Sequence, residues 1–106
     1  MRFANPYWSN KLQMDALQRW VLVQSIIYYE LNSSVVSDKE FDSNARQLVA
    51  MQKQYSKEAK ETEYWYVFYD FDGSTGFDLF ERMNKVDKAY LTQIATHVLR
   101  LSKRSR

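Results

Sequence analysis

An apolar stripe with helical spacing, followed at once by a turn and a second helix start, constrains the fold of this chain most. Apolar side chains recur at three- and four-residue steps at Leu12, Ala16, Trp20, Val23, Ile27 and Leu31. This spacing is that of one face of an α-helix, which we expect to begin at Ser9 or Asn10, after a turn at Pro6, and to end near Leu31. The stripe is widened by Leu17, Val21 and Tyr28, so the helix should be well buried.

A second helix is predicted directly after the turn formers Asn32-Ser33-Ser34. Ser37 and Glu40 have the spacing of a capping box, in which the serine hydroxyl accepts a hydrogen bond from a first-turn amide. Asp38 adds negative charge at the positive end of the helix dipole. The helix should run to about Tyr55, with an inner face of Phe41, Ala45, Leu48 and Val49.

The second half of the chain is expected to hold a polar connector over 56–63, an aromatic run, a turn and a last helix. The run from Tyr64 to Phe71 contains six aromatic residues and is expected to form a short extended segment. Both glycines lie in the turn over 72–76, and the last helix is expected to be broken near Asn84. The predicted fold is therefore mainly α: one small helical bundle over 1–106, with three to four helices and an aromatic-rich extended segment before the last.

Composition excludes several kinds of site. The 106 residues include no cysteine, so disulfides and thiolate metal sites are excluded, and no set of residues has metal-ligand spacing. No apolar h-region begins the chain and no apolar run approaches the ~20 residues of a membrane span, so we expect a cytoplasmic protein with no membrane contact. The net charge is +2, and four basic residues crowd the predicted tail over 100–106, where nucleic-acid binding should be weak at most.

Two possible catalytic features are better explained as structure. Asp70-Phe71-Asp72-Gly73-Ser74-Thr75 resembles the first motif of haloacid-dehalogenase-type phosphatases, but that chemistry needs a doubly wound sheet and acidic residues far downstream. About thirty residues follow Thr75, and they are predicted to be helical. A turn with capping aspartates is therefore the preferred interpretation. His97, the single histidine, has no neighbour in sequence that would make it a general base, so we expect no catalytic residue and no enzyme activity.

The corner between the two predicted helices is the best candidate binding site. It would bring together two aromatic residues at the end of the first helix and three residues on the first turns of the second: Tyr28, Tyr29, Asp38, Phe41 and Asp42. Asp38 and Asp42 are four residues apart and share one helix face. Rings could stack on a planar ligand while carboxylates accept its hydrogen bonds. The alternative is that the tyrosines are core, Asp38 serves the helix dipole and Asp42 is solvated.

The string from Tyr28 to Asp42, continuing to Arg46-Gln47-Leu48, resembles the N-terminal Ia domain of bacterial NAD-dependent DNA ligases. That family has a Tyr-His helix end, a short loop with Asp-x-Glu-Tyr-Asp, and an Arg-x-Leu helix. The spacing is gap-free from Tyr28 to Asp42, and the similarity covers roughly 17–55. The resemblance implies a helical domain that closes over the nicotinamide mononucleotide half of NAD, with contacts from Tyr28, Asp38 and Asp42.

Two positions depart from the family pattern. Tyr29 stands where the family has histidine and Phe41 where it has tyrosine, and each lost polar contact could cost on the order of 1–3 kcal/mol if its partner stayed buried. We expect no other ligase domain within these 106 residues. The resemblance thus implies a stand-alone, non-catalytic domain that requires no cofactor but has NAD or nicotinamide mononucleotide as its candidate ligand. Short proteins of this pattern resemble ligase-related reading frames of bacteriophages and prophages, so the resemblance suggests such an origin.

An alternative function is a phage-encoded protein-interaction module in the host cytoplasm, which would inhibit or modulate a host ligase or defence nuclease. Clustered tyrosine and tryptophan residues are typical anchors of protein interfaces. The candidate anchors are Tyr64, Trp65 and Tyr66. The competing interpretation is that this cluster is ordinary core.

Overall fold

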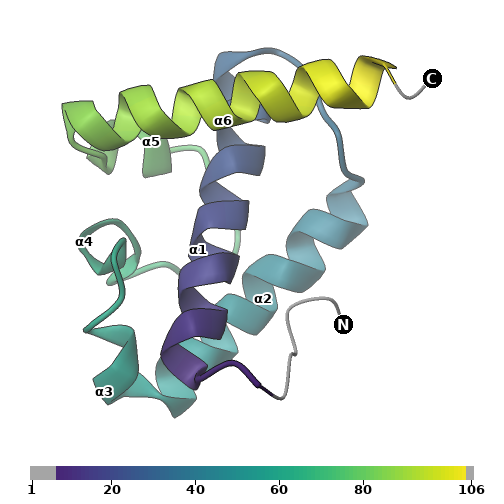
Figure 1. Ribbon diagram of the computed structural model, residues 1–106. Helices are drawn as coiled ribbons and strands as arrows, with labels where there is room; N and C mark the ends of the chain where they lie inside the picture. The colour runs from purple at the N-terminus through teal and green to yellow at the C-terminus, as the bar shows by residue number, and fades with distance from the viewer. Residues whose placement is uncertain (1–6, 105–106) are drawn as a thin grey trace.

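Three long helices form the framework of the protein (Figure 1). They are α1 (Asn10–Ser25), α2 (Asp38–Gln54) and α6 (Lys85–Arg104) in a computed structural model that describes residues 7–104. Between these residues the regular structure is entirely helical, which confirms the prediction of a small, mainly α domain. Four short helical segments complete it: η1 (Ile26–Glu30), α3 (Ser56–Ala59), α4 (Trp65–Phe68) and α5 (Leu79–Arg82).

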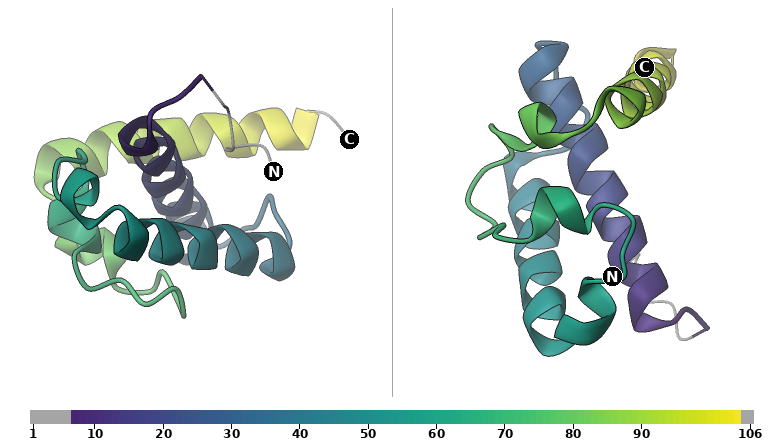
Figure 2. Two further views of the ribbon diagram at one scale, coloured as in Figure 1. Left: turned by 90° about the horizontal axis from the view of Figure 1, so that it is seen from below. Right: turned by 90° about the vertical axis from the view of Figure 1, so that its left-hand side faces the viewer.

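The first helix lies at the centre of the bundle. Its N-terminus is capped by Ser9, whose hydroxyl accepts a hydrogen bond from the Leu12 amide at 3.1 Å. Two views show α2 beside α1, while α6 crosses its C-terminal half (Figures 1 and 2). Because two helices cover it, residues 21–27 are all buried. The predicted burial is confirmed, although Leu12, at the start of the predicted stripe, is 46% exposed.

The last turn of the first helix is a π-turn over Ile26–Glu30. The Leu31 amide donates to the Ile26 carbonyl at 3.0 Å, five residues back, where an α-helix would use the fourth. Asn32 then takes a positive φ of 51°, which asparagine tolerates better than most residues. The helix therefore ends at the predicted place, but through a wider turn than predicted.

The predicted start of the second helix is confirmed by its cap. The Ser37 hydroxyl accepts a hydrogen bond from the Glu40 amide at 3.0 Å, and α2 ends one residue before Tyr55. The buried face combines apolar and polar side chains, namely Asn44, Ala45, Leu48, Met51 and Gln52.

A buried hydrogen-bond network joins α1, α2 and the connector before α4. The Gln18 side-chain amide donates to Gln52 at 3.1 Å and to the Thr62 hydroxyl at 2.8 Å. The Gln52 amide in turn donates to the Phe68 carbonyl at 3.2 Å, and Thr62 donates to the Ala59 carbonyl. A polar network of this kind fixes one arrangement of the helices, because other arrangements would leave buried groups unpaired.

The middle of the aromatic run, Trp65–Phe68, is helical, so the prediction of an extended segment was wrong. Tyr64, Val67 and Phe68 are fully buried, and their spacing of three and four residues is that of one helical face. The exposed face is also aromatic, with Tyr66 and Tyr69. Aromatic residues on both faces hid the helical period in the sequence.

The C-terminal part follows the predicted turn and broken helix. The Asn84 side chain accepts a hydrogen bond from the Asp87 amide at 2.8 Å, so the break predicted near Asn84 is confirmed as a new helix start. Leu91 and Ala95 of α6 are buried. The basic residues predicted as a tail lie mainly on the last turns of α6.

The predicted Pro6 turn, the start of the chain, and positions 105 and 106 of the basic tail lie outside the described residues. Over residues 7–104, no helix combines the length and apolar character that crossing a bilayer requires.

Candidate functional site

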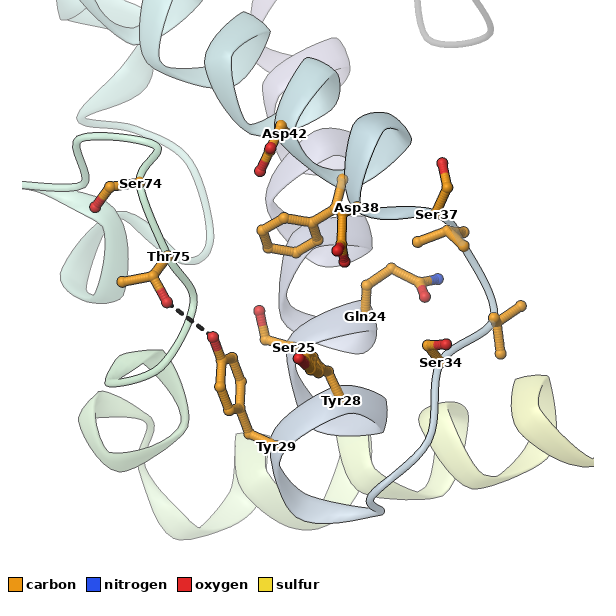
Figure 3. Close-up of a pocket in the computed structure, with 13 residues that line it drawn as sticks. Gln24, Ser25, Tyr28, Tyr29, Ser34, Ser37, Asp38, Asp42, Ser74 and Thr75 are labelled. Carbon is orange, nitrogen blue, oxygen red and sulfur yellow. Dashed lines mark hydrogen bonds between the residues drawn. The ribbon is translucent and has the colours of Figure 1, made fainter.

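A pocket of about 290 Å³ lies between the α1–α2 corner and the loop over 72–77 (Figure 3). All five residues predicted for the corner line it: Tyr28, Tyr29, Asp38, Phe41 and Asp42. The fold therefore brings these side chains together around one space. Eight further residues complete the lining: Gln24, Ser25, Ser34, Val35, Val36, Ser37, Ser74 and Thr75.

The aromatic wall of the pocket is built by the π-turn. Adjacent residues of an α-helix do not face each other, yet in this wider turn the rings of Tyr28 and Tyr29 stack at 4.8 Å between centroids and 19° between planes. Tyr28 is 53% exposed. Because Tyr29 covers one face of the Tyr28 ring, the remaining surface of that ring is what the pocket offers a planar ligand.

Tyr29 joins the corner to the opposite wall. Its hydroxyl forms a 2.8 Å hydrogen bond with the Thr75 hydroxyl (Figure 3). Its ring and that of Phe77 meet edge to face at 5.5 Å between centroids. The tyrosine that replaces the histidine of the ligase pattern thus contacts the loop over 72–77, for which the resemblance offered no counterpart.

The acidic wall comes from the first turns of α2. Figure 3 shows the carboxyl groups of Asp38 and Asp42 on the side of the helix that faces the pocket. Among residues 7–104, neither carboxylate has a hydrogen-bond or ion-pair partner. Among residues 7–104, no lysine, arginine or histidine lines this pocket, so its described charged groups are all negative.

The floor of the pocket holds a buried hydroxyl. Ser25 is 3% exposed, and its Oγ has no hydrogen-bond partner among the described residues. Figure 3 shows this hydroxyl pointing toward the space between Tyr29 and Asp38. Gln24, 8% exposed, lies beside it in the lining. The Ser25 hydroxyl has less than 1 Å² of exposed surface, because Gly76 of the opposite loop packs over it.

The loop over 72–77 is the part of the site that the sequence did not reveal. Asp72 fixes its turn by accepting hydrogen bonds from the Ser74 amide at 2.9 Å and the Ser74 hydroxyl at 2.7 Å. Gly73 has a φ of 84°, where a side chain would be strained, and a Cβ at Gly76 would stand 2.1 Å from Ser25 Oγ. In the sequence, the two glycines predicted a turn here, but they did not indicate that the turn packs against the α1–α2 corner.

Gly76→Ala is expected to lower the free energy of unfolding by about 1–3 kcal/mol, because the added methyl overlaps Ser25. Adding Ser25→Ala should restore part of the loss; the rest persists because the new Cβ still lies 3.0 Å from the Ser25 Cβ. Urea denaturation of both single variants and the double variant measures this. If Gly76→Ala lowered the free energy of unfolding equally with and without Ser25→Ala, the contact between Gly76 and the Ser25 hydroxyl would be contradicted.

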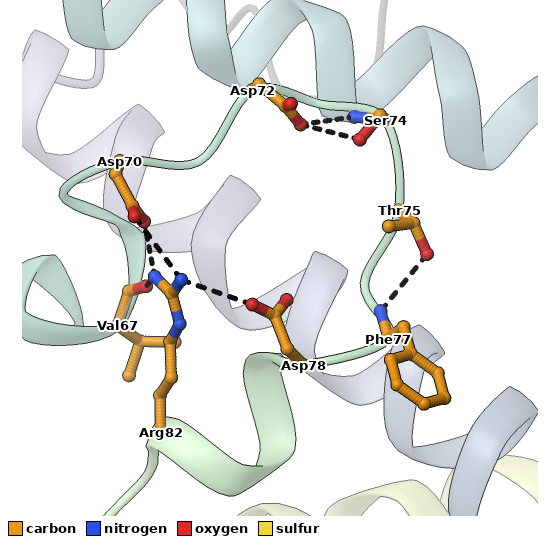
Figure 4. A network of polar contacts seen from close by, with 8 residues as sticks. All are labelled: Val67, Asp70, Asp72, Ser74, Thr75, Phe77, Asp78 and Arg82. Atoms are coloured by element: carbon orange, nitrogen blue, oxygen red, sulfur yellow. Dashed lines mark hydrogen bonds and ion pairs between the residues drawn. The ribbon is translucent and has the colours of Figure 1, made fainter.

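The phosphatase-like sequence at Asp70 forms a structural ion-pair network (Figure 4). Arg82 donates to the carboxylate of Asp70, to Asp78 at 3.1 Å and to the Val67 carbonyl at 3.2 Å. The hydrogen bond from Arg82 holds the pKa of Asp70 below its ordinary value. With Asp72 bonded to Ser74, the aspartates of this motif serve the turn, as the preferred interpretation stated. In the described part of the chain, acidic and histidine residues form no metal-ligand group.

The three predicted interface anchors occupy different environments. Tyr64 is fully buried, which corrects its assignment to the surface: it directly precedes α4 and lies in the core with Val67 and Phe68 of that helix. Trp65 is half-buried, and Tyr66 is 40% exposed. The Tyr66 hydroxyl donates to Asp87 and accepts from the Asn84 amide at 3.2 Å, so this residue links α4 to the start of α6.

His97, the single histidine of the sequence, lies exposed on α6.

Tyr66→Phe is expected to lower the free energy of unfolding at pH 8. The difference in this free energy between the variant and the wild type should narrow as the pH rises from about 10 to 12. Burial, followed by the hydrogen bond to Asp87, raises the pKa of Tyr66 to about 12, above the ordinary value of about 10. The neutral phenol is therefore favoured in the folded state, and its contribution is lost as the pH rises through the folded pKa. Urea denaturation at pH 8, 10 and 11 measures the difference in free energy of unfolding. A difference that stays constant over this range would contradict the raised pKa of Tyr66.

Comparison of the chain with protein-family models, with curated proteins and with solved structures gave no match. The relation to the ligase Ia domain therefore stays a prediction from sequence.

Proposed function

We propose that this domain binds NAD or nicotinamide mononucleotide through the nicotinamide–ribose half, in a pocket like that of the ligase Ia domain, without acting on the ligand. One observation supports this most: the five residues predicted for the corner, which include the three contacts that the resemblance implies, line a single pocket of about 290 Å³. Ligand pockets ordinarily measure roughly 300–1,000 Å³, so this one suits half of a dinucleotide better than the whole.

The lining offers complementary groups for such a ligand. Tyr28 presents a half-exposed ring on which the nicotinamide ring can stack. Asp38 and Asp42 can accept hydrogen bonds from the ribose hydroxyls, since neither carboxylate is engaged by another described residue. The hydroxyl of Tyr29 is hydrogen-bonded to Thr75, so Tyr29 would form part of the pocket wall and would not contact the ligand through its hydroxyl. The adenylate half of NAD would extend outside the pocket.

Titration calorimetry with NAD and nicotinamide mononucleotide tests the proposal. We expect measurable heat with the wild-type protein and none with Asp38→Ala combined with Asp42→Ala. A matched control removes two exposed carboxylates outside the pocket, in Glu61→Ala with Glu81→Ala, and should bind like the wild type. Absence of heat at millimolar ligand, with a helical circular-dichroism spectrum, would refute nucleotide binding.

We propose protein interaction as the second candidate function, on the strength of a separate aromatic groove. It measures about 340 Å³ and is lined by Trp65, Tyr69 and Phe71 from the aromatic run, together with Val49 and Lys53 of α2. Tyr69 is 59% exposed, and Arg82 lies 5.4 Å from the centre of its ring. Exposed aromatic and cationic side chains are frequent anchors of interfaces.

A pull-down from bacterial lysate separates the two functions. The second candidate predicts a partner that is retained by Asp38→Ala with Asp42→Ala and lost by Tyr69→Ser with Lys53→Glu. Recovery of no partner by the wild-type protein, or equal recovery by both double variants, would count against an interface at this groove.

A further inference from the structure

We infer that the aromatic groove between α2 and α4 binds a proline-rich segment of a partner protein, with an acidic residue among the prolines. This inference rests on the second candidate function and adds to it the chemical class of the partner. The segment would lie in the groove as a polyproline II helix.

The rings of the groove provide the wall that such a helix needs. Trp65 begins α4, and Tyr69 follows its last residue with the backbone still in the helical region, so the two lie one helical turn apart. Both line the groove, and Phe71 and Val49 extend its apolar surface. Phe71 is held edge-on against the buried ring of Phe68 at 5.1 Å between centroids. Proline-rich segments dock in aromatic-lined grooves, because a polyproline II helix is extended before it binds and loses little freedom.

The polar groups of the groove favour a ligand that accepts hydrogen bonds and donates few. Among residues 7–104, the indole N–H of Trp65 and the hydroxyl of Tyr69 have no hydrogen-bond partner. The side-chain acceptors of the lining already accept hydrogen bonds within the protein; they belong to Gln52, Asp70 and Asp72. A proline residue has a backbone carbonyl but no N–H. A proline-rich segment therefore supplies the acceptors that the two aromatic donors lack and leaves no donor of its own unpaired.

The charge of the groove indicates which residue accompanies the prolines. Lys53 is exposed, lines the groove and forms no ion pair with any residue from 7 to 104. The carboxylate of Asp70 is already paired with Arg82, and Asp72 accepts its hydrogen bonds from Ser74. The cation left to be matched is thus Lys53, so an acidic side chain of the segment should lie beside it. Because the pair is exposed, it should tune affinity only a few-fold.

Proton–nitrogen correlation NMR of the isotope-labelled protein, titrated with decaproline, tests the inference. We expect the indole N–H signal of Trp65, assigned by its loss in Trp65→Phe, to shift, while those of Trp8 and Trp20 stay in place. A glycine–serine peptide of the same length should shift none of the three signals, because it has no proline rings to pack against the aromatic wall.

Calorimetry with decaproline measures the contribution of each ring. Trp65→Phe keeps an aromatic ring and removes the N–H donor, so it should weaken binding by roughly three- to ten-fold. Tyr69→Ala removes an exposed anchor and should weaken it by at least about ten-fold. The matched control is Tyr90→Ala on α6, where the tyrosine is 49% exposed and lies outside the groove; it should bind like the wild type.

Two further peptides test the charge: decaproline with glutamate, or with lysine, at one central position. The glutamate peptide should bind about three-fold more tightly than the lysine peptide. Lys53→Glu should reverse this order. Lys57→Glu, an exposed lysine outside the groove, should leave the order unchanged.

The outcomes separate the inference from the function beneath it. No indole shift at millimolar decaproline with folded protein, equal binding of the glycine–serine peptide, undiminished binding by Tyr69→Ala, or an order of the charged peptides that Lys53→Glu does not change would each overturn the inference. The second candidate function would then stand only if the pull-down still recovers a partner that Tyr69→Ser with Lys53→Glu loses. A dimer in sedimentation that the same double variant abolishes would assign the groove to a second copy and overturn the inference as well.

Discussion

Phe68→Ala is expected to lower the free energy of unfolding by about 3–5 kcal/mol, the cost of deleting a large buried aromatic side chain. Phe68 is fully buried on the inner face of α4, and its ring meets that of Phe71 edge-on at 5.1 Å between centroids. A four-residue helix cannot fold alone, so α4 depends on such contacts. Urea denaturation followed by circular dichroism measures the loss.

The matched control for Phe68→Ala is Tyr69→Ala, the next residue and 59% exposed. We expect it to cost much less, since most of its ring already contacts water. Equal losses in the two variants would mean that the aromatic run does not pack by the helical face described above.

Gln52→Leu is expected to lower the free energy of unfolding by about 1–3 kcal/mol, because it removes two buried hydrogen bonds. The Gln18 amide would keep Thr62 as an acceptor, and the Phe68 carbonyl would keep the Phe71 amide as a donor, so neither group would be left without a partner. The net contribution of a hydrogen bond is roughly 0.5–1.5 kcal/mol. Gln54→Leu, at an exposed position of the same helix, should change the stability little.

A double-mutant cycle tests how much of the cost of Gln52→Leu comes from its hydrogen bond with Gln18. Gln18→Leu combined with Gln52→Leu replaces both partners of one hydrogen bond by apolar side chains of similar size. We expect the double variant to lose less stability than the two single variants added together. Additive losses would show that the two amides do not act as a pair.

Local signals made the frame of the fold predictable. The hydroxyls of Ser9 and Ser37 and the side-chain oxygen of Asn84 each accept a hydrogen bond from an amide three residues ahead, and this pattern can be recognised in a sequence. The aromatic run was not predictable in this way. Hydrophobic periodicity needs a polar face for contrast, and α4 has aromatic residues on its exposed face as well as on its buried one.

The candidate site was predictable only on one side. Tyr28, Asp38 and Asp42 are close in sequence and belong to two helix ends, so a short loop was enough to place them together. Ser74 and Thr75 come from more than thirty residues downstream, and their packing against the corner depends on Gly76 meeting Ser25. No local pattern encodes that contact. The resemblance to ligase domains gave no guide either, since it ends before this loop.

The π-turn at Ile26–Glu30 also has a consequence for how this pocket can vary among related chains. A π-turn accommodates about one residue more than the 3.6 of an α-helical turn, and each residue of a helix rotates the chain by about 100°. Deleting a single residue there would restore α-helical winding and redirect Tyr28 and Tyr29 away from their present stack. The shape of the aromatic wall is therefore encoded in the length of this segment as much as in its side chains, so an insertion or deletion there would remodel the pocket more than most substitutions.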